Sequence, residues 1–581
     1  MSTRNLQYLF RPKSVAVVGA SDRPDTVGQI VTRNLIEGGF KGPVMPVNPK
    51  HSAVAGVPAF SSIAALPEPP DLAVICTPAA TIPGIIGELG ARSTKAAIVI
   101  ASGLDRAKDE RGVTFQQAML DAAKPHLLRV LGPDSIGLMN ARLRLNASFA
   151  HTMPMQGKLA FISQSGALAT AVLDHAKSVG IGLAHCVSVG NGADVDFADV
   201  LDYLGSDRDT RAVLLYIESV TDARKFMSAA RAASRNKLVL AIKGGRAQAG
   251  ARAAALHSGG CAGSDAVIDA AIRRAGMLRV DSILELFDAV ETLGRMRPLK
   301  GERLGILTNG GGPGVMAVDA LETQQGTLSQ LSDETRARLN RILPPYWSGA
   351  NPVDILGDAP AKRHADAIGT LLDDENTDAV LLLHAPHAVV SSSEVAEEAA
   401  KVVGATKKNV LACLLGLDSV EPARRLFSDA GIPTYETPEH AVNAFLQMVE
   451  YRRNQQMLME TPDAVPEQAN LASETVRGIV VRALAEKRER LSHAEANEIL
   501  AAYEIPVVPT RVVRSPYEAA EAAEELGFPV ALKLHSDDIH PKPDIGGVVL
   551  DIETAGEVRA AAIAMTQRLE ALLPEANADG F

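Results

Sequence analysis

Short apolar runs alternate with helix-like segments over the first part of the chain. The run SVAVVGA at residues 14–20 is typical of a buried strand that ends in a glycine turn. Further runs of this kind lie at residues 42–49, 71–78, 96–103 and 129–140. Strands separated by helices predict a parallel, doubly wound sheet, and strands this apolar indicate that helices cover both faces. We therefore predict an α/β domain at residues 1–140.

The same strand–turn–helix pattern occurs in two further stretches of the chain. Residues 150–296 contain GKLAFISQSGALATAVLDHA, and residues 300–455 contain RLGILTNGGGPGVMAVDAL. Later strands of the two stretches are predicted at residues 184–191, 212–219, 238–245, 378–386 and 410–416. The sequence thus predicts α/β architecture with three doubly wound parallel-sheet domains in series.

The remaining residues differ in character from these three domains. Residues 456–490 are polar and charged, which is typical of a linker with helical parts. A fourth unit is predicted at residues 491–581, and its first helix begins with a capping box formed by Ser492 and Glu495. The unit ends at Phe581 on a helix and a loop, so we expect only part of a domain there.

Composition and charge narrow the class of protein. The chain has 581 residues, of which 46% are hydrophobic and 22% charged, as in globular proteins with sizeable cores. The net charge of −11 argues against nucleic-acid and anionic-membrane partners. The first residues contain no signal-like apolar run. The cysteines show no metal-ligand or disulfide spacing, which favours a reducing, cytoplasmic location; they are Cys76, Cys186, Cys261 and Cys413.

Candidate ligand-binding residues follow the strands of the first predicted domain. Gly19 ends a strand before a helix and permits a close backbone approach, but its nine-residue distance from Gly28 does not match GxGxxG. A nucleotide-type site and a plain βα turn both remain open for this turn. Lys50 and Thr77-Pro78 also lie at strand ends, where ligands bind in doubly wound sheets.

Two other turns have the composition of anion sites. Ser165-Gly166 stands between a strand and a helix start that lacks bulk and carboxylates, which suits an anion. Gly310, Gly311 and Gly312 follow Asn309 at the end of another strand. Three consecutive glycines are entropically costly to order, which favours a ligand held close to the backbone.

His257 stands in the stretch ARAAALHSGGCAGSDA among small residues. A histidine nitrogen can act as a nucleophile and carry a phosphoryl group, and small neighbours leave room for that chemistry. Glu218 ends a predicted strand and could orient the imidazole by accepting its other N–H. Alone, each residue is more simply a surface histidine or a rim carboxylate; with the two anion sites, catalysis is favoured.

The fourth unit offers a weaker signal. Lys533 lies on a predicted strand, and Gly546 and Gly547 precede another. A strand lysine beside a glycine hairpin can bind nucleotide phosphates.

Taken in order, these motifs resemble one family. SVAVVGASDRP, ISQSGALATAVLD, LYIES, HSGGCAGSDAV, TNGGGPGVMAVDAL and NPVDILG together resemble NDP-forming acyl-CoA synthetases of the acetate–CoA ligase (ADP-forming) type, relatives of succinyl-CoA synthetase. The resemblance covers nearly the whole chain. It implies a Rossmann-like CoA-binding domain, two flavodoxin-like ligase domains and the first lobe of an ATP-grasp domain.

The resemblance also implies a reaction and its participants. Acyl-CoA, phosphate and ADP would be converted reversibly to a carboxylic acid, CoA and ATP through an acyl phosphate and a phosphohistidine. His257 would be phosphorylated, Glu218 would stabilise it, and the turns at Ser165-Gly166 and Asn309–Gly312 would hold the phosphoryl group. CoA would contact Gly19, Ala20, Ser21, Lys50, Thr77 and Pro78, and the nucleotide would contact Lys533, Gly546 and Gly547.

The resemblance extends to cofactors and partners. Mg²⁺ is expected through a second ATP-grasp lobe, with no metal ligand in this chain. A homo-oligomer, or a partner chain that supplies the rest of the ATP-grasp domain, is expected with small carboxylic acids or acyl-CoA as substrates.

Three positions depart from the family pattern. HSG replaces His-Thr-Gly, and Pro133-Asp134-Ser135 replaces Pro-Asn-Cys. In an alignment without a gap from Gly546, Pro541 stands where the family has a histidine that relays the phosphoryl group to nucleotide, and His540 lies one residue before it. Either the register slips by one residue, or the relay is impaired. Pro541 supports an alternative, a CoA-binding regulatory or sensor protein with an impaired ligase. A second alternative is a relative of the CoA ligase-like protein acyltransferases, although no acetyltransferase region is present.

Overall fold

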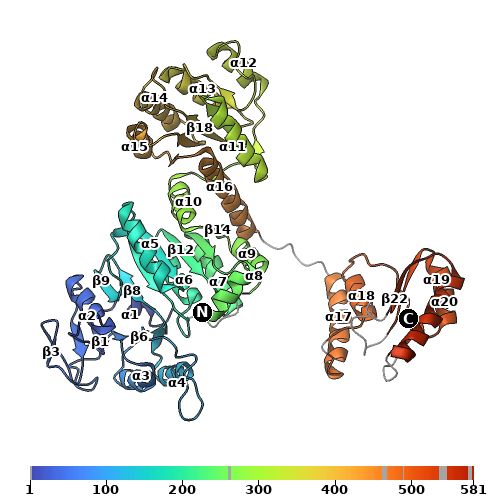
Figure 1. The fold of residues 1–581 in the computed structure, drawn as a ribbon, viewed down its shortest axis with the longest axis horizontal. Coiled ribbons are helices and arrows are strands. Elements are labelled where there is room, and N and C mark those ends of the chain that lie inside the picture. The colour runs from blue at the N-terminus through green and yellow to red at the C-terminus, as the bar shows by residue number, and fades with distance from the viewer. Residues whose placement is uncertain (1–2, 259–262, 461–467, 489, 536–545, 573–578) are drawn as a thin grey trace. The chain divides into compact units, whose positions relative to one another are not determined.

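The computed structural model describes residues 3–258, 263–460, 468–488, 490–535, 546–572 and 579–581. The chain forms two compact units, Met1–Glu460 and Thr461–Phe581 (Figure 1). Among the described residues, the first unit contains three large sheets of five, seven and six strands, together with a small hairpin of β3 (Ala53–Val54) and β4 (Val57–Pro58). The prediction of three α/β sheets in series is confirmed.

The first sheet is parallel, with the order β2-β1-β5-β6-β7. Its strands are β1 (Val15–Val18), β2 (Val44–Val47), β5 (Leu72–Ile75), β6 (Ala96–Val99) and β7 (Arg129–Leu131). Successive strand residues point to opposite faces, so one face packs on α1 (Leu6–Phe10) and α2 (Val27–Glu37) and the other on α3 (Ile82–Ala91) and α4 (Phe115–Ala123). The strand order reverses direction between β1 and β5, which is where ligands bind in such sheets.

The second sheet has the order β14-β13-β12-β10-β11-β8-β9. Its parallel strands are β10 (Gln156–Ser163), β11 (Leu183–Ser188), β12 (Ala212–Ile217), β13 (Leu238–Lys243) and β14 (Leu278–Val280). Two helices, α5 (Gly166–Ser178) and α10 (Ile283–Arg295), pack on one face. The opposite face packs on α6 (Phe197–Ser206), α7 (Ala223–Ser234) and α9 (Asp265–Arg274). A further helix, α8 (Gln248–Ser258), follows β13.

The edge of this sheet departs from the predicted pattern. Residues 129–140 were expected to continue the first sheet, but only β7 does so. The next strand, β8 (Gly137–Asn140), pairs antiparallel with β11 and with β9 (Leu145–Ser148). Five residues separate β7 from β8, and a parallel crossover needs a dozen or more, so β8 cannot continue a parallel sheet beside β7.

The third sheet is parallel, with the order β16-β15-β18-β19-β20 and β17 beside β15. Its strands are β15 (Arg303–Thr308), β16 (Thr327–Leu328), β17 (Val353–Asp354), β18 (Ala379–His384), β19 (Asn409–Leu414) and β20 (Thr434–Tyr435). Its helices are α11 (Gly311–Thr323), α12 (Asp333–Ile342), α13 (Ala361–Asp373), α14 (Ser392–Ala405) and α15 (Glu421–Asp429).

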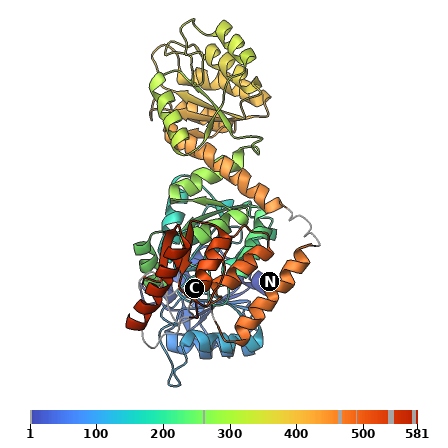
Figure 2. The same ribbon diagram turned by 90° about the vertical axis from the view of Figure 1, so that its right-hand side faces the viewer.

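One long helix, α16 (Pro438–Met459), links the second and third sheets (Figure 2). Its first turns bury Ala441 and Phe445 against the third sheet. Near its end, Asn454 Nδ2 donates to the Met277 carbonyl at 2.8 Å and Gln455 Nε2 donates to the Gly276 carbonyl at 2.7 Å. The C-terminal part of α16 is therefore attached to the residues that lead into β14 of the second sheet.

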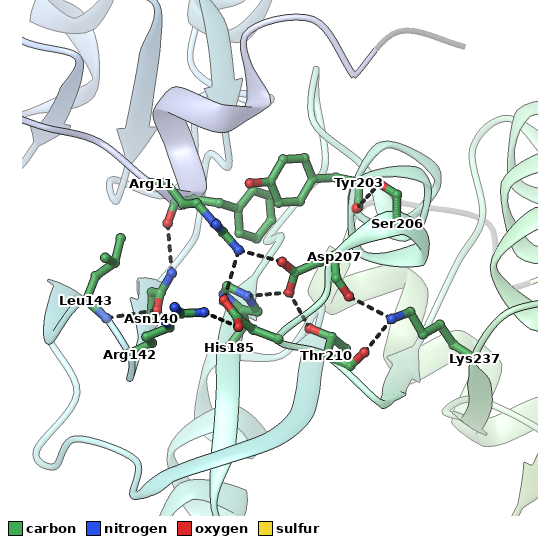
Figure 3. Close-up of polar contacts among 12 residues, drawn as sticks. Arg11, Asn140, Arg142, Leu143, His185, Tyr203, Ser206, Asp207, Thr210 and Lys237 are labelled. Atoms are coloured by element: carbon green, nitrogen blue, oxygen red, sulfur yellow. Dashed lines mark hydrogen bonds and ion pairs between the residues drawn. The ribbon is translucent and has the colours of Figure 1, made fainter.

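A polar cluster at the amino edge of the second sheet attaches the N-terminal segment (Figure 3). Arg11, which follows α1, donates to Asp207 at 2.7 Å. Asp207 is buried, and although burial opposes its ionisation, hydrogen bonds from His185 and Thr210 lower its pKa. On the far side of the cluster, Lys237 donates to the carbonyls of Asp207 and Thr210. The cluster is structural and lies at the opposite edge from the candidate site.

The second unit is smaller. It contains α17 (Gln468–Ala485), α18 (His493–Ala502), α19 (Pro516–Leu526), β21 (Val530–Lys533), β22 (Val548–Ile552) and α20 (Ala555–Leu572). The predicted capping box is confirmed: Ser492 Oγ accepts from Glu495 N at 3.2 Å, and Glu495 Oε2 accepts from Ser492 N at 2.8 Å. None of the described helices of the chain is long and apolar enough to cross a membrane.

Candidate functional site

The ends of β1 and β5 and the start of α2 meet closely at the carboxyl edge of the first sheet. Gly19 has a φ of +88°, and a Cβ on it would lie 2.9 Å from Thr77 Cγ2. A Cβ on Gly28, at the start of α2, would lie 2.0 Å from the Gly19 carbonyl oxygen. Gly28 requires glycine because the start of α2 packs directly on the end of β1, and Gly19 requires it because of its positive φ and the closeness of Thr77. The nine-residue spacing reflects a longer loop between two glycines that are neighbours in space.

The neighbouring strand brings Lys50 to the same edge. Asn48 Nδ2 donates to the Ala20 carbonyl at 2.6 Å, and Asn48 Oδ1 accepts from Lys50 N at 2.8 Å. Ser21 Oγ accepts from Arg23 N at 3.0 Å, which fixes the loop after β1. The residues expected to contact CoA thus come from the ends of adjacent strands β2, β1 and β5: Gly19, Ala20, Ser21, Lys50, Thr77 and Pro78.

At the second sheet, Gln164 joins the ends of β10 and β12. Its Oε1 accepts from the backbone N–H groups of Glu218 at 2.5 Å and Ser219 at 2.9 Å. Its Nε2 donates to Ser219 Oγ at 3.3 Å. Gln164 was not among the predicted site residues, and its position directly after an apolar strand was the available signal. Gln164 fixes the backbone from which the Glu218 side chain projects.

The turn at Ser165-Gly166 is shaped by packing. Ser165 Oγ caps α5 by accepting from Leu168 N at 3.3 Å. A Cβ on Gly166 would lie 2.4 Å from Ile136 Cγ2, so glycine is required by the segment before β8. The start of α5 lacks carboxylates in its first turn and retains the field that favours an anion.

Glu218 is 6% exposed at the end of β12. Burial, followed by the charge of Glu218 and a hydrogen bond with it, raises the pKa of Tyr216 to about 12. The two side chains therefore meet at the carboxyl edge, beside the turn that leads to α8.

The helix that carries His257 begins close to this edge. In that turn Gly245 has a φ of +71°, and a Cβ on it would lie 3.2 Å from Ala254 Cβ, so α8 folds back over the turn. His257 lies near the end of α8. Its side chain lies outside the described residues, so its contact with Glu218 stays a prediction.

The third sheet repeats the arrangement of the second. Asn309 follows β15, is 2% exposed, donates to the Ala385 carbonyl at 2.9 Å and accepts from Ala385 N at 2.9 Å. Thr308 Oγ1 donates to the Gly310 carbonyl at 2.7 Å and accepts from Gly310 N at 3.1 Å. In the second sheet, Ser163 Oγ makes the matching pair of bonds to Ser165. Both sheets thus hold a strand–helix turn with one hydroxyl and one amide side chain.

The glycines at the start of α11 differ from Gly166. No heavy atom would lie within 4 Å of a Cβ on Gly312, and the nearest to a Cβ on Gly311 is Asp354 Oδ2 at 3.6 Å. Gly310 caps the helix without a side chain. Packing within the described residues therefore does not demand these glycines, which suits close approach of a ligand to the backbone.

Buried histidines that the sequence analysis missed lie behind Asn309. His384 Nδ1 is 3.4 Å from Asn309 Nδ2, and its Nε2 is 3.0 Å from Ser392 Oγ. Burial, followed by the charges of His364 and His387, lowers the pKa of His384 to about 4. The His384 ring is neutral at pH 7 and supports the position of Asn309.

In the second unit, Lys533 and the glycines are neighbours across a hairpin. Lys533 pairs with Val548, and Leu534 N donates to the Gly547 carbonyl at 2.9 Å. A Cβ on Gly546, whose φ is +69°, would lie 1.9 Å from Arg568 Nη1. Pro541 and the neighbouring His540 lie outside the described residues.

Four family descriptions match successive parts of the chain. They are a CoA binding domain (residues 13–141), a succinyl-CoA ligase like flavodoxin domain (156–293), a ligase-CoA domain (304–458) and an ATP-grasp domain (482–581). The chain is 37% identical over 576 residues to acetate–CoA ligase (ADP-forming) I of Archaeoglobus fulgidus, which covers 99% of this chain and 82% of the relative. The chain belongs to the ADP-forming acetate–CoA ligase family.

Two further matches each cover more than three quarters of this chain and nearly all of the matched chain. The subunit alpha of acetate–CoA ligase (ADP-forming) I from Pyrococcus furiosus is 37% identical over 455 residues, or 77% of this chain and 98% of the subunit. A solved dinucleotide forming acetyl-coenzyme A synthetase 1 of Ca. Korarchaeum cryptofilum, in complex with phosphate and ADP, superposes with a TM-score of 0.70 and 35% identity. That match covers 79% of this chain and 99% of the solved chain.

Proposed function

We propose that this member of the ADP-forming acetate–CoA ligase family converts acyl-CoA, phosphate and ADP reversibly to a carboxylic acid, CoA and ATP. The observation that carries the proposal is the repeated arrangement at the ends of β10 and β12 and of β15 and β18. In both places an amide side chain fixes the neighbouring strand end beside a helix start that suits a phosphate. A solved family member with phosphate and ADP supports the same chemistry.

The proposed reaction has three balanced steps. Phosphate attacks the acyl carbonyl, the C–S bond breaks, and CoA leaves with an acyl phosphate remaining. A nitrogen of His257 then attacks phosphorus, the P–O bond to the acyl oxygen breaks, and the carboxylate leaves. In the last step ADP takes the phosphoryl group from His257 to give ATP. Glu218 would accept the other imidazole N–H and stabilise the charged ring.

Each substrate has a proposed place. CoA would lie over the β1–β5 edge against Gly19, Ala20, Ser21, Lys50, Thr77 and Pro78. The phosphoryl group would meet the starts of α5 (Ser165, Gly166) and α11 (Asn309, Gly310, Gly311, Gly312). The nucleotide would meet Lys533, Gly546 and Gly547 in the second unit. Acetate is the first acid to test, since relatives are named for it.

Magnesium and partner chains are the remaining parts of the proposal. Mg²⁺ would accompany the nucleotide, but no group of three or more His, Cys, Asp or Glu among the described residues could hold a metal ion. Because a relative is a named subunit, we expect this chain to work as a homo-oligomer or with a second chain.

Labelled phosphate tests the proposed function. Incubation with acetyl-CoA and ³²P-phosphate should place acid-labile label on the protein, and His257→Ala should abolish it. Addition of ADP should then release the label as ATP. Absence of label on the wild-type protein with several acyl-CoAs, together with measurable CoA binding, would favour a CoA-binding regulatory protein.

A further inference from the structure

A buried lysine, Lys243, lies at the end of β13 and has no role in the reaction steps proposed for His257 and Glu218. Lys243 is 3% exposed and is the one lysine or arginine in the buried class among the described residues. Burying an ammonium group is costly unless an anion or several acceptors surround it. Its position therefore needs a counter-charge.

The described residues do not supply that counter-charge. Lys243 Nζ donates to the Gly244 carbonyl, and within the described part of the chain no carboxylate oxygen lies within 4.0 Å of it. An ammonium group has three N–H donors, so this bond uses one of them. Other half-buried cations of the same domain are paired, as Lys225 is with Asp196 and Asp199.

The carboxylate with the largest favourable charge effect on Lys243 is already paired with an arginine. Asp265, at the start of α9, accepts two bonds from Arg279 Nη2 at 2.9 and 3.0 Å. Arg279 also meets Asp269 at 3.2 Å. The charges of Asp265 and Glu218 favour the charged form of Lys243, while burial, the largest cause, and Arg279 lower its pKa.

The position of Lys243 fits a phosphate at the same edge. Lys243 ends β13, Glu218 follows β12, and Ser165 follows β10, and these strands are consecutive neighbours. At about 4.8 Å between strands, Lys243 and the start of α5 are separated by roughly 10 Å of sheet edge. Gly244 and Gly245 then lead from Lys243 to α8, which carries His257.

We propose, on the basis of the proposed function, that the Lys243 ammonium group binds the phosphate that reacts with acyl-CoA. The same ammonium group then lies beside the phosphoryl group when that group is bound to His257. Two of its N–H donors would then bind an oxyanion supplied from outside the protein fold. The ligand class is inorganic phosphate or a phosphoryl group, because a compact dianion offsets a desolvated ammonium group best. Glu218 on one side then holds the imidazole while Lys243 balances the phosphoryl charge.

The test compares two lysines at opposite ends of one strand. Lys243→Met removes the charge at the end of β13, Lys243→Arg keeps a charge, and Lys237→Met removes a lysine just before β13 that donates to backbone carbonyls. In the wild-type protein, inorganic phosphate should raise the thermal unfolding midpoint more than chloride at equal ionic strength. Lys243→Met should lose that increase, and the other two variants should keep it.

Kinetics provide the second measurement. With acetyl-CoA and phosphate as substrates, Lys243→Met should raise KM for phosphate at least about tenfold while KM for acetyl-CoA stays within about twofold. Lys243→Arg should restore much of the phosphate affinity. A Lys243→Met protein with wild-type phosphate dependence in both measurements overturns the proposal.

Two precautions separate the possible failures. If Lys243→Met does not fold, Lys243→Gln, which keeps a polar side chain without the charge, replaces it: its unfolding midpoint must not rise with phosphate, or the proposal fails. The midpoint shift needs no turnover. A wild-type protein that never consumes acetyl-CoA thus defeats the proposed function, whereas an active protein whose phosphate dependence survives in Lys243→Met defeats only this inference.

Discussion

Gln164 Oε1 accepts the backbone N–H of Glu218 at 2.5 Å and so joins the ends of two neighbouring parallel strands. The bond fixes the backbone of the residue proposed to orient His257. Gln164 Oε1 also accepts from Ser219 N. One side chain therefore satisfies two backbone N–H groups at the end of the sheet, where neither a helix nor a neighbouring strand supplies an acceptor.

Replacement of Gln164 by methionine should therefore affect both stability and activity. Methionine has no amide oxygen, so the backbone N–H groups of Glu218 and Ser219 lose their acceptor. This loss should lower the free energy of unfolding by about 1–3 kcal/mol. The rate of His257 phosphorylation should fall at least about tenfold as Glu218 shifts. Urea unfolding and ³²P labelling measure the two effects. Gln117→Met, at an exposed helix position bonded to Asp121, is the control, and equal behaviour of the two variants would contradict the role of Gln164.

Glu218→Gln keeps the shape of the side chain but removes its charge. If Glu218 stabilises the imidazolium formed on phosphoryl transfer, the rate of label uptake should fall by roughly 10² or more, with little change in CoA binding. Rapid-quench labelling and calorimetric CoA titration report the two quantities. Glu322→Gln, at an exposed position of α11, should match the wild-type protein. An unchanged labelling rate in Glu218→Gln would remove Glu218 from the mechanism.

Gly28→Ala tests the close contact between α2 and β1. A Cβ at 2.0 Å from the Gly19 carbonyl oxygen forces the helix away from the strand, and overpacking of this kind costs about 1–3 kcal/mol. CoA affinity should weaken as well, because the contacting edge moves. Gly87→Ala in α3 meets no heavy atom within 4 Å and should instead gain up to about 1 kcal/mol from helix propensity. Wild-type CoA affinity in a Gly28→Ala protein that shows the expected loss of stability would argue against the edge of the first sheet as the CoA site.

Acid should destabilise the third domain through two buried histidines. Burial lowers the folded-state pKa of both His364 and His384 to about 4, against an ordinary value of about 6.5. As the pH falls below 6.5, these histidines take up protons in the unfolded chain but not in the folded protein. The free energy of unfolding is therefore highest above about pH 6.5 and declines between pH 6.5 and pH 4. Each histidine contributes up to about 1.4 kcal/mol per pH unit. Urea unfolding at pH 7, 6 and 5 should show this slope, and His364→Asn/His384→Asn should flatten it; an unchanged slope in the double variant counts against the assignment.

The sequence predicted the sheets better than their connections. Apolar runs fixed the positions of β1, β10 and β15 because buried parallel strands leave a clear pattern. The antiparallel hairpin of β8 and β9 was missed because its apolar residues look like those of a parallel strand. Only the short connection after β7 distinguishes them.

In the candidate site, too, individual residues were predicted but their contacts were not. Gly19 and Gly28 were recognised as separate glycines, but their contact depends on how the chain folds between them. Gly166 was predicted as an anion site, yet its small size is also required by Ile136, which lies far from it in the sequence. The tertiary partners of Gln164 and Asn309 leave no local pattern, so neither bond could be predicted.

The end of α16 has a practical consequence for dividing the chain. Asn454 and Gln455 hold the Met277 and Gly276 carbonyls, so an expression fragment that stops at residue 455 removes the final turn that locks this attachment. Fragments ending after Met459 retain that turn, and a protease cut introduced after Glu460 would divide the chain between the two units. Mixing the separated halves then offers a direct assay of whether phosphoryl transfer needs a covalent connection.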